Sequence, residues 1–275
     1  MQRVKNMEIT DKRIDGGKAF DWGRTSEDYA KYRDIYPQIF YEKIVGRGLC
    51  VKGQSVLDIG TGTGVLPRNM YQYGAKWTGT DISPEQTAQA RRLSEESGMD
   101  IVYKALPTEE LDFPPESFDV ITACQCFWYF DHERVMPLLW KMLKPGGKLV
   151  ILYMAWLPYE DEIARASEAI VLQYSPDWSG AGERRRPIDI PTAAYQFFEL
   201  EDSEEYDLSV PFTKQSWHGR MKACRGVGAS LTGKQLADWE REHWHMLGQK
   251  MTSENEEFNV KHYAALAVLR KKDSI

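Results

Sequence analysis

The stretch Val56–Gly64, "VLDIGTGTG", decides the fold. A short apolar run predicts a buried strand, and the glycines Gly60, Gly62 and Gly64 follow it at every second position. Glycine adopts positive φ and lets another group come close to the main chain. A glycine-rich turn after the first strand lies at the carboxyl edge of an open α/β sheet, where such sheets bind ligands. We therefore expect a ligand site at this turn.

Strands and helices alternate downstream of residue 55. The strands are expected at residues 55–60, 76–82, 100–106, 118–127 and 148–156, and the helices at 65–74, 83–98 and 132–144. Ser83 is a typical N-cap, with Pro84 at the first helical position. This β-α-β-α order predicts a parallel sheet with helices on both faces.

The flanking regions extend this pattern. Residues 26–46 predict two short helices divided at Pro37, and residues 159–174 predict a further helix. Two late strands at 197–210 and 257–271 bring the sheet to seven. Between them a helical block at about 213–251 contains Trp217, Trp239 and Trp244. We expect three regions: N-terminal cap helices over 1–50, a ligand-binding core over 51–156, and 157–275, which completes the sheet and carries the helical block.

The glycine pattern restricts the ligand. A dinucleotide fingerprint, G-x-G-x-x-G, would place its last glycine at residue 65, where this chain has Val65. A phosphate loop would end in Gly-Lys-Ser/Thr, and the first cation here, Arg68, comes one helical turn later. These features predict a nucleoside without a pyrophosphate. Asp81, at the end of the second strand, can accept hydrogen bonds from both hydroxyls of a ribose.

Composition excludes several classes of partner. The 275-residue chain has a formal charge of −6, and its one compact basic run is Arg184–Arg186, so we expect no nucleic acid to bind. The four cysteines form no CxxC pair, and we expect no metal site. No segment is long and apolar enough for a membrane span or a signal peptide, which favours a cytoplasmic protein with no membrane partner.

Four segments in this order resemble a known family. "VLDIGTGTG", "TGTDIS", "FDVITACQCFWYFD" and "LKPGGKLVI" are similar to the successive motifs of class I S-adenosylmethionine-dependent methyltransferases, in the small-molecule branch typified by the ubiquinone-biosynthesis and trans-aconitate enzymes. The resemblance implies a Rossmann-like, doubly wound, mostly parallel seven-stranded sheet whose last strand is antiparallel, with the helical block as a lid. It also implies methyl transfer from S-adenosyl-L-methionine to a small-molecule acceptor.

The resemblance assigns roles to individual positions. The glycine loop would pass under the methionine part of the cofactor, Asp58 would orient the loop and the amino group, and Asp81 would hold the ribose. Pro107 stands where the family more often has an aspartate near adenine. The full set of implied cofactor-binding residues is Tyr29, Arg33, Asp58, Gly60, Thr61, Gly62, Gly64, Asp81, Ile82, Thr108, Glu109 and Gln125.

Methyl transfer depends mainly on positioning, so we look for a lid rather than a catalytic triad. A general base is needed only if the acceptor must lose a proton, and the candidates are His132 and His218. Gly226 and Gly228 are candidate hinges. Core packing explains each tryptophan of the helical block equally well. The candidate acceptor-binding residues are Trp128, Tyr129, Trp217, Arg220 and Arg225.

Other readings remain. The chain lacks the Asn/Asp-Pro-Pro-aromatic motif of nucleic-acid amino-methyltransferases after the fourth strand, and we find no paired-glutamate hairpin of protein-arginine methyltransferases. A nicotinamide dehydrogenase and a catalytically silent S-adenosylmethionine- or S-adenosylhomocysteine-binding protein stay open. The sequence does not indicate the acceptor, the atom that is methylated or the oligomeric state.

Overall fold

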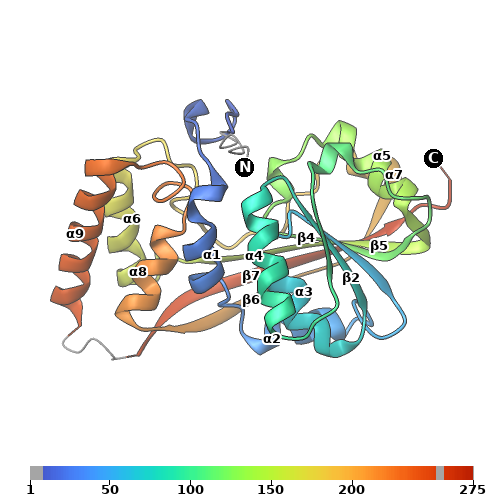
Figure 1. Cartoon of the computed structure of the whole chain (residues 1–275), viewed down its shortest axis with the longest axis horizontal. Coiled ribbons are helices and arrows are strands. Elements are labelled where there is room, and N and C mark those ends of the chain that lie inside the picture. The colour runs from blue at the N-terminus through green and yellow to red at the C-terminus, as the bar shows by residue number, and fades with distance from the viewer. Residues whose placement is uncertain (1–8, 252–256, 275) are drawn as a thin grey trace. The chain divides into compact units, whose positions relative to one another are not determined.

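In the computed structural model, which describes residues 9–251 and 257–274, seven strands form one sheet in the order β3-β2-β1-β4-β5-β7-β6 (Figure 1). The strands are β1 Ser55–Ile59, β2 Lys76–Asp81, β3 Val102–Ala105, β4 Phe118–Cys124, β5 Leu143–Trp156, β6 Phe198–Phe212 and β7 Phe258–Lys271.

The sheet is mostly parallel. Strands β1 and β2, β2 and β3, β1 and β4, and β4 and β5 all pair in parallel. Strand β7 runs the other way. Just past the end of β5, Leu157 donates its main-chain N–H to the carbonyl of Lys261 near the start of β7, whereas Lys271 at the end of β7 bonds to the carbonyl of Leu143 at the start of β5. The predicted seven-stranded, Rossmann-like sheet with an antiparallel last strand is therefore confirmed.

The chain divides into two compact units. Unit 1 comprises residues 1–35, 155–185 and 207–263, and unit 2 comprises residues 36–154, 186–206 and 264–275. Strands β5, β6 and β7 contribute residues to both.

Unit 2 contains the strands on either side of β1 and their helices. Val56, Leu57 and Ile59 of β1 are fully buried, as an apolar strand between two parallel neighbours requires. Helix α4 packs against β2 and β3, and α5 packs against α7 (Figure 1). The helices of this unit are α2 Gln38–Val45, α3 Val65–Met70, α4 Pro84–Glu96, α5 His132–Met142 and α7 Ala194–Phe197.

Local sequence signals account for several helix ends. Pro37 directly precedes α2 and separates it from α1, and the Ser83 hydroxyl accepts the main-chain N–H of Gln86 at the start of α4, both as predicted. Other predicted bounds differ from those in the structure. The helix at 65–74 ends at Met70 and continues as the 3₁₀ turn Tyr71–Tyr73, and β5 begins five residues before the predicted position because Leu143 pairs with Phe118 before a shift of register.

Unit 1 is built around aromatic side chains. Its helices are α1 Ser26–Tyr32, α6 Glu162–Tyr174, α8 Lys214–Lys222 and α9 Gly233–Lys250. The ring of Trp217 lies edge-on to Phe212 at 4.9 Å and to Trp156 at 5.6 Å, and the Trp217 side chain is fully buried. Helix α1 packs closely on α8, since a Cβ atom placed on Gly219 would lie 2.3 Å from the ring of Tyr32. The predicted helical block therefore folds as α8 and α9.

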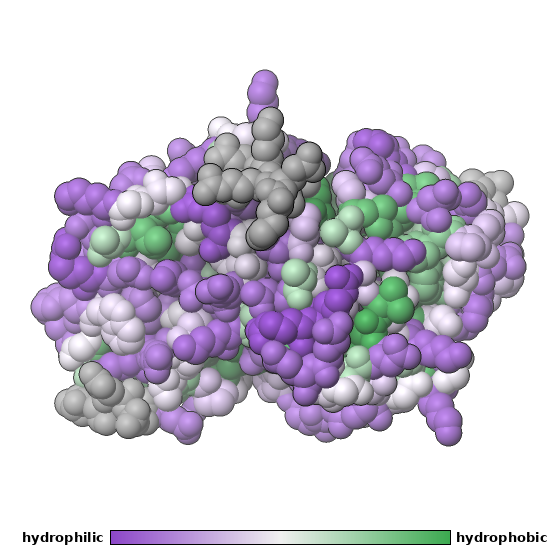
Figure 2. Space-filling model, viewed as in Figure 1, coloured by the Kyte–Doolittle hydropathy of each residue, from purple (hydrophilic) through white to green (hydrophobic). Residues whose placement is uncertain are grey.

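Hydrophilic residues dominate the face shown in Figure 2, and hydrophobic residues form only small patches on it. Among the residues that the structure describes, no helix combines the length and apolar character needed to cross a membrane.

Candidate functional site

The carboxyl ends of four neighbouring strands meet in unit 2. In the parallel register, Ile59 at the end of β1 lies opposite Thr80 of β2 and Ala123 of β4, and Asp81 lies opposite Ala105 of β3. The segments that leave these strands carry most of the predicted cofactor-binding residues. The topology thus places them along one edge of the sheet, where α/β folds of this kind bind ligands.

The glycine loop adopts a conformation that other residues disfavour. Gly60, Gly62 and Gly64 have φ angles of 61°, 57° and 72°, all in the left-handed region. Asp81 fixes the middle of the loop, because its Oδ2 accepts the main-chain N–H of Gly62 at 2.8 Å. Its Oδ1 accepts the N–H of Ser83 at 2.9 Å. Each carboxylate oxygen can accept about two hydrogen bonds, so Asp81 keeps acceptor capacity on both oxygens.

A second carboxyl group lies beneath the loop. Asp58 is 2% exposed, and its Oδ1 accepts a hydrogen bond of 2.6 Å from the hydroxyl of Thr122 on β4. Burial, and to a smaller extent the nearby Asp81, raise the pKa of Asp58 to about 7, although the hydrogen bond from Thr122 lowers it. A perturbed carboxyl group at a sheet edge is typical of functional sites.

The remaining cofactor candidates of unit 2 surround this edge. Thr61 donates its main-chain N–H to Thr80 of β2 and is buried, and Ile82 is half-buried. Thr108 is buried in a 3₁₀ turn. The neighbouring Glu109 accepts the main-chain N–H of Asp131 at 3.0 Å, ahead of α5.

The segment after β4 has an unusual main chain. Gln125 has a φ of 67°, a conformation rare outside glycine, and its side-chain amide donates to the carbonyl of Met154 on β5 at 2.6 Å. The half-buried ring of Trp128 lies edge-on to Tyr153 at 4.9 Å, and Tyr129 is also half-buried. Nε2 of His132 lies 3.0 Å from the carbonyl oxygen of Phe127. A carbonyl oxygen only accepts, so this nitrogen carries the proton and Nδ1 is the basic nitrogen.

Comparison with known proteins agrees with this geometry. Residues 57–151 match the model of a family described as a methyltransferase domain. The ubiquinone biosynthesis O-methyltransferase of Pseudomonas entomophila is 34% identical over 130 residues, which cover 46% of this chain and 55% of that protein. The chain thus aligns with little more than half the length of this relative.

Solved structures share the fold at low identity. YcgJ from Bacillus subtilis is 18% identical with a TM-score of 0.54, and the alignment covers 86% of this chain and 100% of YcgJ. A Haemonchus contortus phosphoethanolamine N-methyltransferase, solved with phosphomonomethylethanolamine and S-adenosylhomocysteine, is 18% identical with a TM-score of 0.51, over 90% of this chain and 58% of that one. At this identity the likeness shows the fold alone.

The other predicted residues belong to unit 1, outside residues 57–151, which match the family model. Tyr29 is in α1, but its side chain lies outside the described part of the structure, and Arg33 follows α1 directly. Trp217 and Arg220 are both buried on α8. The guanidinium of Arg220 lies 4.8 Å above the ring of Trp156, and its Nη1 is 3.1 Å from the Cys224 sulfur. Both side chains take part in the packing of unit 1.

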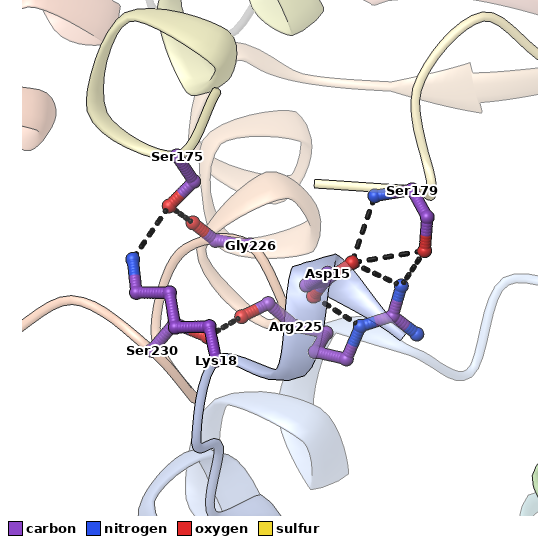
Figure 3. A network of polar contacts seen from close by, with 7 residues as sticks. All are labelled: Asp15, Lys18, Ser175, Ser179, Arg225, Gly226 and Ser230. Atoms are coloured by element: carbon purple, nitrogen blue, oxygen red, sulfur yellow. Dashed lines mark hydrogen bonds and ion pairs between the residues drawn. The ribbon is translucent and has the colours of Figure 1, made fainter. Parts of the chain in front are cut away.

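Arg225 has a partner that the sequence did not reveal. Its Nε and Nη2 donate to the two oxygens of Asp15 at 2.6 and 2.9 Å (Figure 3). Ser179 donates to the same carboxylate through its main-chain N–H and its hydroxyl. Only 4% of the Asp15 side chain and 10% of the Arg225 side chain are exposed. The guanidinium of Arg225 is therefore engaged by a buried carboxylate within unit 1.

The two candidate hinge glycines lie where the surrounding atoms leave no room for a side chain. A Cβ atom on Gly226 would lie 2.6 Å from the ring of Trp178, and one on Gly228 would lie 2.6 Å from the carbonyl oxygen of Lys222. A small cavity of about 40 Å³ beside Gly226, also bordered by Lys18, has room for water but not for a metabolite. Within the described residues, no group of three or more His, Cys, Asp and Glu side chains is arranged to hold a metal ion.

His218 belongs to a buried network in unit 1. Its Nδ1 lies 2.9 Å from Nδ1 of His243, whose Nε2 lies 2.9 Å from the hydroxyl of Ser167, and Trp217 donates its indole N–H to that hydroxyl. Burial lowers the pKa of both His218 and His243 below the ordinary value of about 6.5. Both rings are therefore neutral near pH 7. If both rings were protonated, the N–H groups at the two Nδ1 atoms would point at each other with no acceptor between them.

We expect this pair to make unit 1 sensitive to acid. Because both pKa values are lowered, the unfolded chain binds more protons below pH 6.5, and the free energy of unfolding should fall as pH decreases, by up to about 1.4 kcal/mol per pH unit for each ring. Urea unfolding at pH 7.5, 6.5, 5.8 and 5.2 measures this slope. The raised pKa of Asp58 acts in the opposite direction, so His218→Phe is compared with the unmodified protein at each pH.

The exposed His245 provides the control, since His245→Gln should leave the pH dependence unchanged. A His218→Phe variant with an undiminished slope would show that the buried pair does not titrate on unfolding.

Sequence reasoning missed the side chains that support the site. Thr122, Tyr103 and Cys126 contact Asp58, Gly64 and Gly60, respectively. No local pattern marks them, because each contact joins different strands or their connecting segments. The alternation of β4 does identify Thr122 as a polar residue in an apolar run, which was the one available signal.

Proposed function

We propose that the protein transfers a methyl group from S-adenosylmethionine to a small-molecule acceptor, and that the cofactor binds at the carboxyl edge of β1, β2 and β4. The observation that carries the proposal is the Asp81 carboxylate. It lies at the end of β2, bonds once to the loop and once to Ser83, and keeps one acceptor position on each oxygen. A ribose diol offers two donors to such a pair of oxygens, so the residues present fit the cofactor.

Other residues of the domain would complete the cofactor site. The Asp58 carboxylate would attract the positively charged amino group of the cofactor. That positive charge would in turn stabilise the ionised form of this buried carboxyl group. The positive-φ glycines leave the main chain of the loop uncovered by their own side chains. Thr108 and Glu109 stand where the family contacts adenine. The fold neighbour solved with S-adenosylhomocysteine supports this choice of cofactor.

When bound, S-adenosylmethionine supplies a methyl group activated by a positively charged sulfur. The chain then has to hold the acceptor in line and keep water out, and such positioning is worth about 7–11 kcal/mol of the barrier. Where the acceptor must lose a proton, Nδ1 of His132 is the available base in unit 2, because Nε2 donates to Phe127. The ubiquinone-biosynthesis relative supports a small-molecule acceptor.

The ribose contact is tested by Asp81→Ala. We expect the dissociation constant of S-adenosylhomocysteine to rise by a free energy of about 1.5–3 kcal/mol, the worth of hydrogen bonds to a charged group. Isothermal titration calorimetry measures it. Asp119→Ala is the matched control, since Asp119 also accepts a main-chain N–H, from Ser55, but at the start of the strands.

The control variant Asp119→Ala should be less stable than the unmodified protein but should bind S-adenosylhomocysteine with unchanged affinity. An unchanged dissociation constant for Asp81→Ala would remove Asp81 from the site. Tight binding of NAD instead of S-adenosylhomocysteine by the unmodified protein would favour a dehydrogenase. Binding of S-adenosylmethionine without transfer to any of a panel of phenols, amines and carboxylates would favour the catalytically silent alternative.

A further inference from the structure

Side chains of the protein itself occupy the space that the loop glycines leave open. A Cβ atom placed on Gly64 would lie 2.4 Å from the hydroxyl oxygen of Tyr103, and one on Gly60 would lie 2.6 Å from the sulfur of Cys126. Real Cβ contacts are essentially never that short, so these two glycines are required by Tyr103 and Cys126. The two supports touch opposite ends of the loop.

Tyr103 is fixed from several directions. It is 4% exposed on β3, and its hydroxyl lies 3.0 Å from the hydroxyl of Ser94 on α4. Its ring also covers Gly79 of β2, where a Cβ atom would lie 2.8 Å from the ring. Arg91 donates to the Tyr103 carbonyl at 2.9 Å. The phenol is thus a rigid surface against which the end of the loop rests.

Cys126 supports the start of the loop. Its thiol donates to the carbonyl of Ile59 at 3.0 Å, directly before Gly60. Burial raises the pKa of the thiol, which keeps it a neutral S–H donor. Cys124, two residues earlier, points its sulfur at the hydroxyl of Tyr36 instead, 3.6 Å away.

We propose that Tyr103 and Cys126 are positioning residues for the cofactor site, which hold the main chain of Gly60–Gly64 in its binding conformation before the ligand arrives. Three glycines with positive φ would otherwise sample many conformations, and ordering them on binding weakens affinity. This inference rests on the proposed function for its ligand, but the order of the loop can be measured without one.

The first test compares Tyr103→Phe with Ser94→Ala. Both variants lose the same hydrogen bond and should unfold at similarly lowered temperatures. Only Tyr103→Phe removes the Tyr103 atom that lies nearest to the Cβ position of Gly64. We expect it to raise the dissociation constant of S-adenosylhomocysteine about three- to tenfold through lost preorganisation, and to speed amide hydrogen exchange in Gly60–Gly64, with Ser94→Ala close to the unmodified protein in both. Equal effects in the two variants would overturn the role of Tyr103.

The second test compares Cys126→Ala with Cys124→Ala. The first should loosen the loop and weaken binding, and the second should leave both unchanged. Unchanged exchange in Cys126→Ala would overturn the role of Cys126. If the unmodified protein does not bind S-adenosylhomocysteine while the loop still loosens in Tyr103→Phe and Cys126→Ala, the proposed function fails and the structural support of the loop stands.

Discussion

Arg225→Ala should lower the free energy of unfolding by about 3–5 kcal/mol, because it leaves the buried Asp15 carboxylate without its cation. Three distant chain segments meet at this carboxylate: the N-terminal turn with Asp15, the segment after α6 with Ser179, and the segment after α8 with Arg225 (Figure 3). Burial alone would raise the pKa of Asp15, but the hydrogen bonds from Arg225 and Ser179 lower it below its usual range. The pair therefore stabilises the fold at neutral pH and loses that effect as carboxylates become protonated in acid.

Urea unfolding at pH 7.5 measures this effect, with Arg241→Ala as the control. Arg241 pairs with Asp238 at 2.7 Å, but its side chain is 68% exposed, so its loss should cost less than about 1 kcal/mol. The double variant Asp15→Asn/Arg225→Ala should recover part of the stability, since it removes the uncompensated charge. An Arg225→Ala variant as stable as Arg241→Ala would show that the network contributes little.

The sequence predicted those features that local signals encode. Ser83 and Pro37 mark helix starts because capping and the proline ring act within one turn. The alternation of strands and helices predicted the parallel pairing of the first five strands. The spacing of Gly60, Gly62 and Gly64 predicted positive φ, which all three residues adopt. It also suggested that a ligand occupies the space where side chains at these three positions would lie. In the structure, Cys126 fills that space at Gly60 and Tyr103 fills it at Gly64.

The features that were missed depend on contacts between distant residues. Arg225 and Asp15 are 210 residues apart, and nothing near either residue identifies the other. Gly226 was a candidate hinge because a second glycine, Gly228, follows two residues later, but in the structure the ring of Trp178 packs against it and leaves no room for a side chain. The acceptor-binding residues and the lid stay predictions. His218 and Trp217 take part in the buried hydrogen-bond network of unit 1, which gives each of them a structural role.

The affinity for S-adenosylhomocysteine should rise about 100-fold between pH 5 and pH 8 because of Asp58. The pKa of this carboxyl is raised to about 7 in the free protein by burial, so it is mostly protonated at pH 5. Under the proposed function, a positively charged amino group binds near it and favours the carboxylate. Binding then releases a proton, and affinity increases about tenfold per pH unit below pH 7 before it levels off.

Asp58→Asn separates this effect from other titrations. The variant cannot ionise at this position, so its affinity should stay low and nearly constant from pH 5 to pH 8. Thr122, which donates to Asp58, can still donate to the amide oxygen, so the variant keeps the main support of the side chain. Calorimetry in buffers of different ionisation enthalpy counts the released proton directly. Far-UV circular dichroism at each pH shows that the acid-sensitive histidine pair of unit 1 has not unfolded the chain.

The sign of the pH dependence of affinity shows whether a positive charge binds beside Asp58. Ionisation of Asp58 destabilises the free fold, because the raised pKa means that the folded state holds its proton more tightly than the unfolded state does. A ligand with a positive charge at that point reverses the preference, whereas an anionic group would strengthen it. Affinity that increases with pH in the unmodified protein and not in Asp58→Asn therefore places a cation beside Asp58. Affinity that is flat or falls with pH would mean that no such charge binds there, and the orientation of the cofactor inferred from the glycine loop would be wrong.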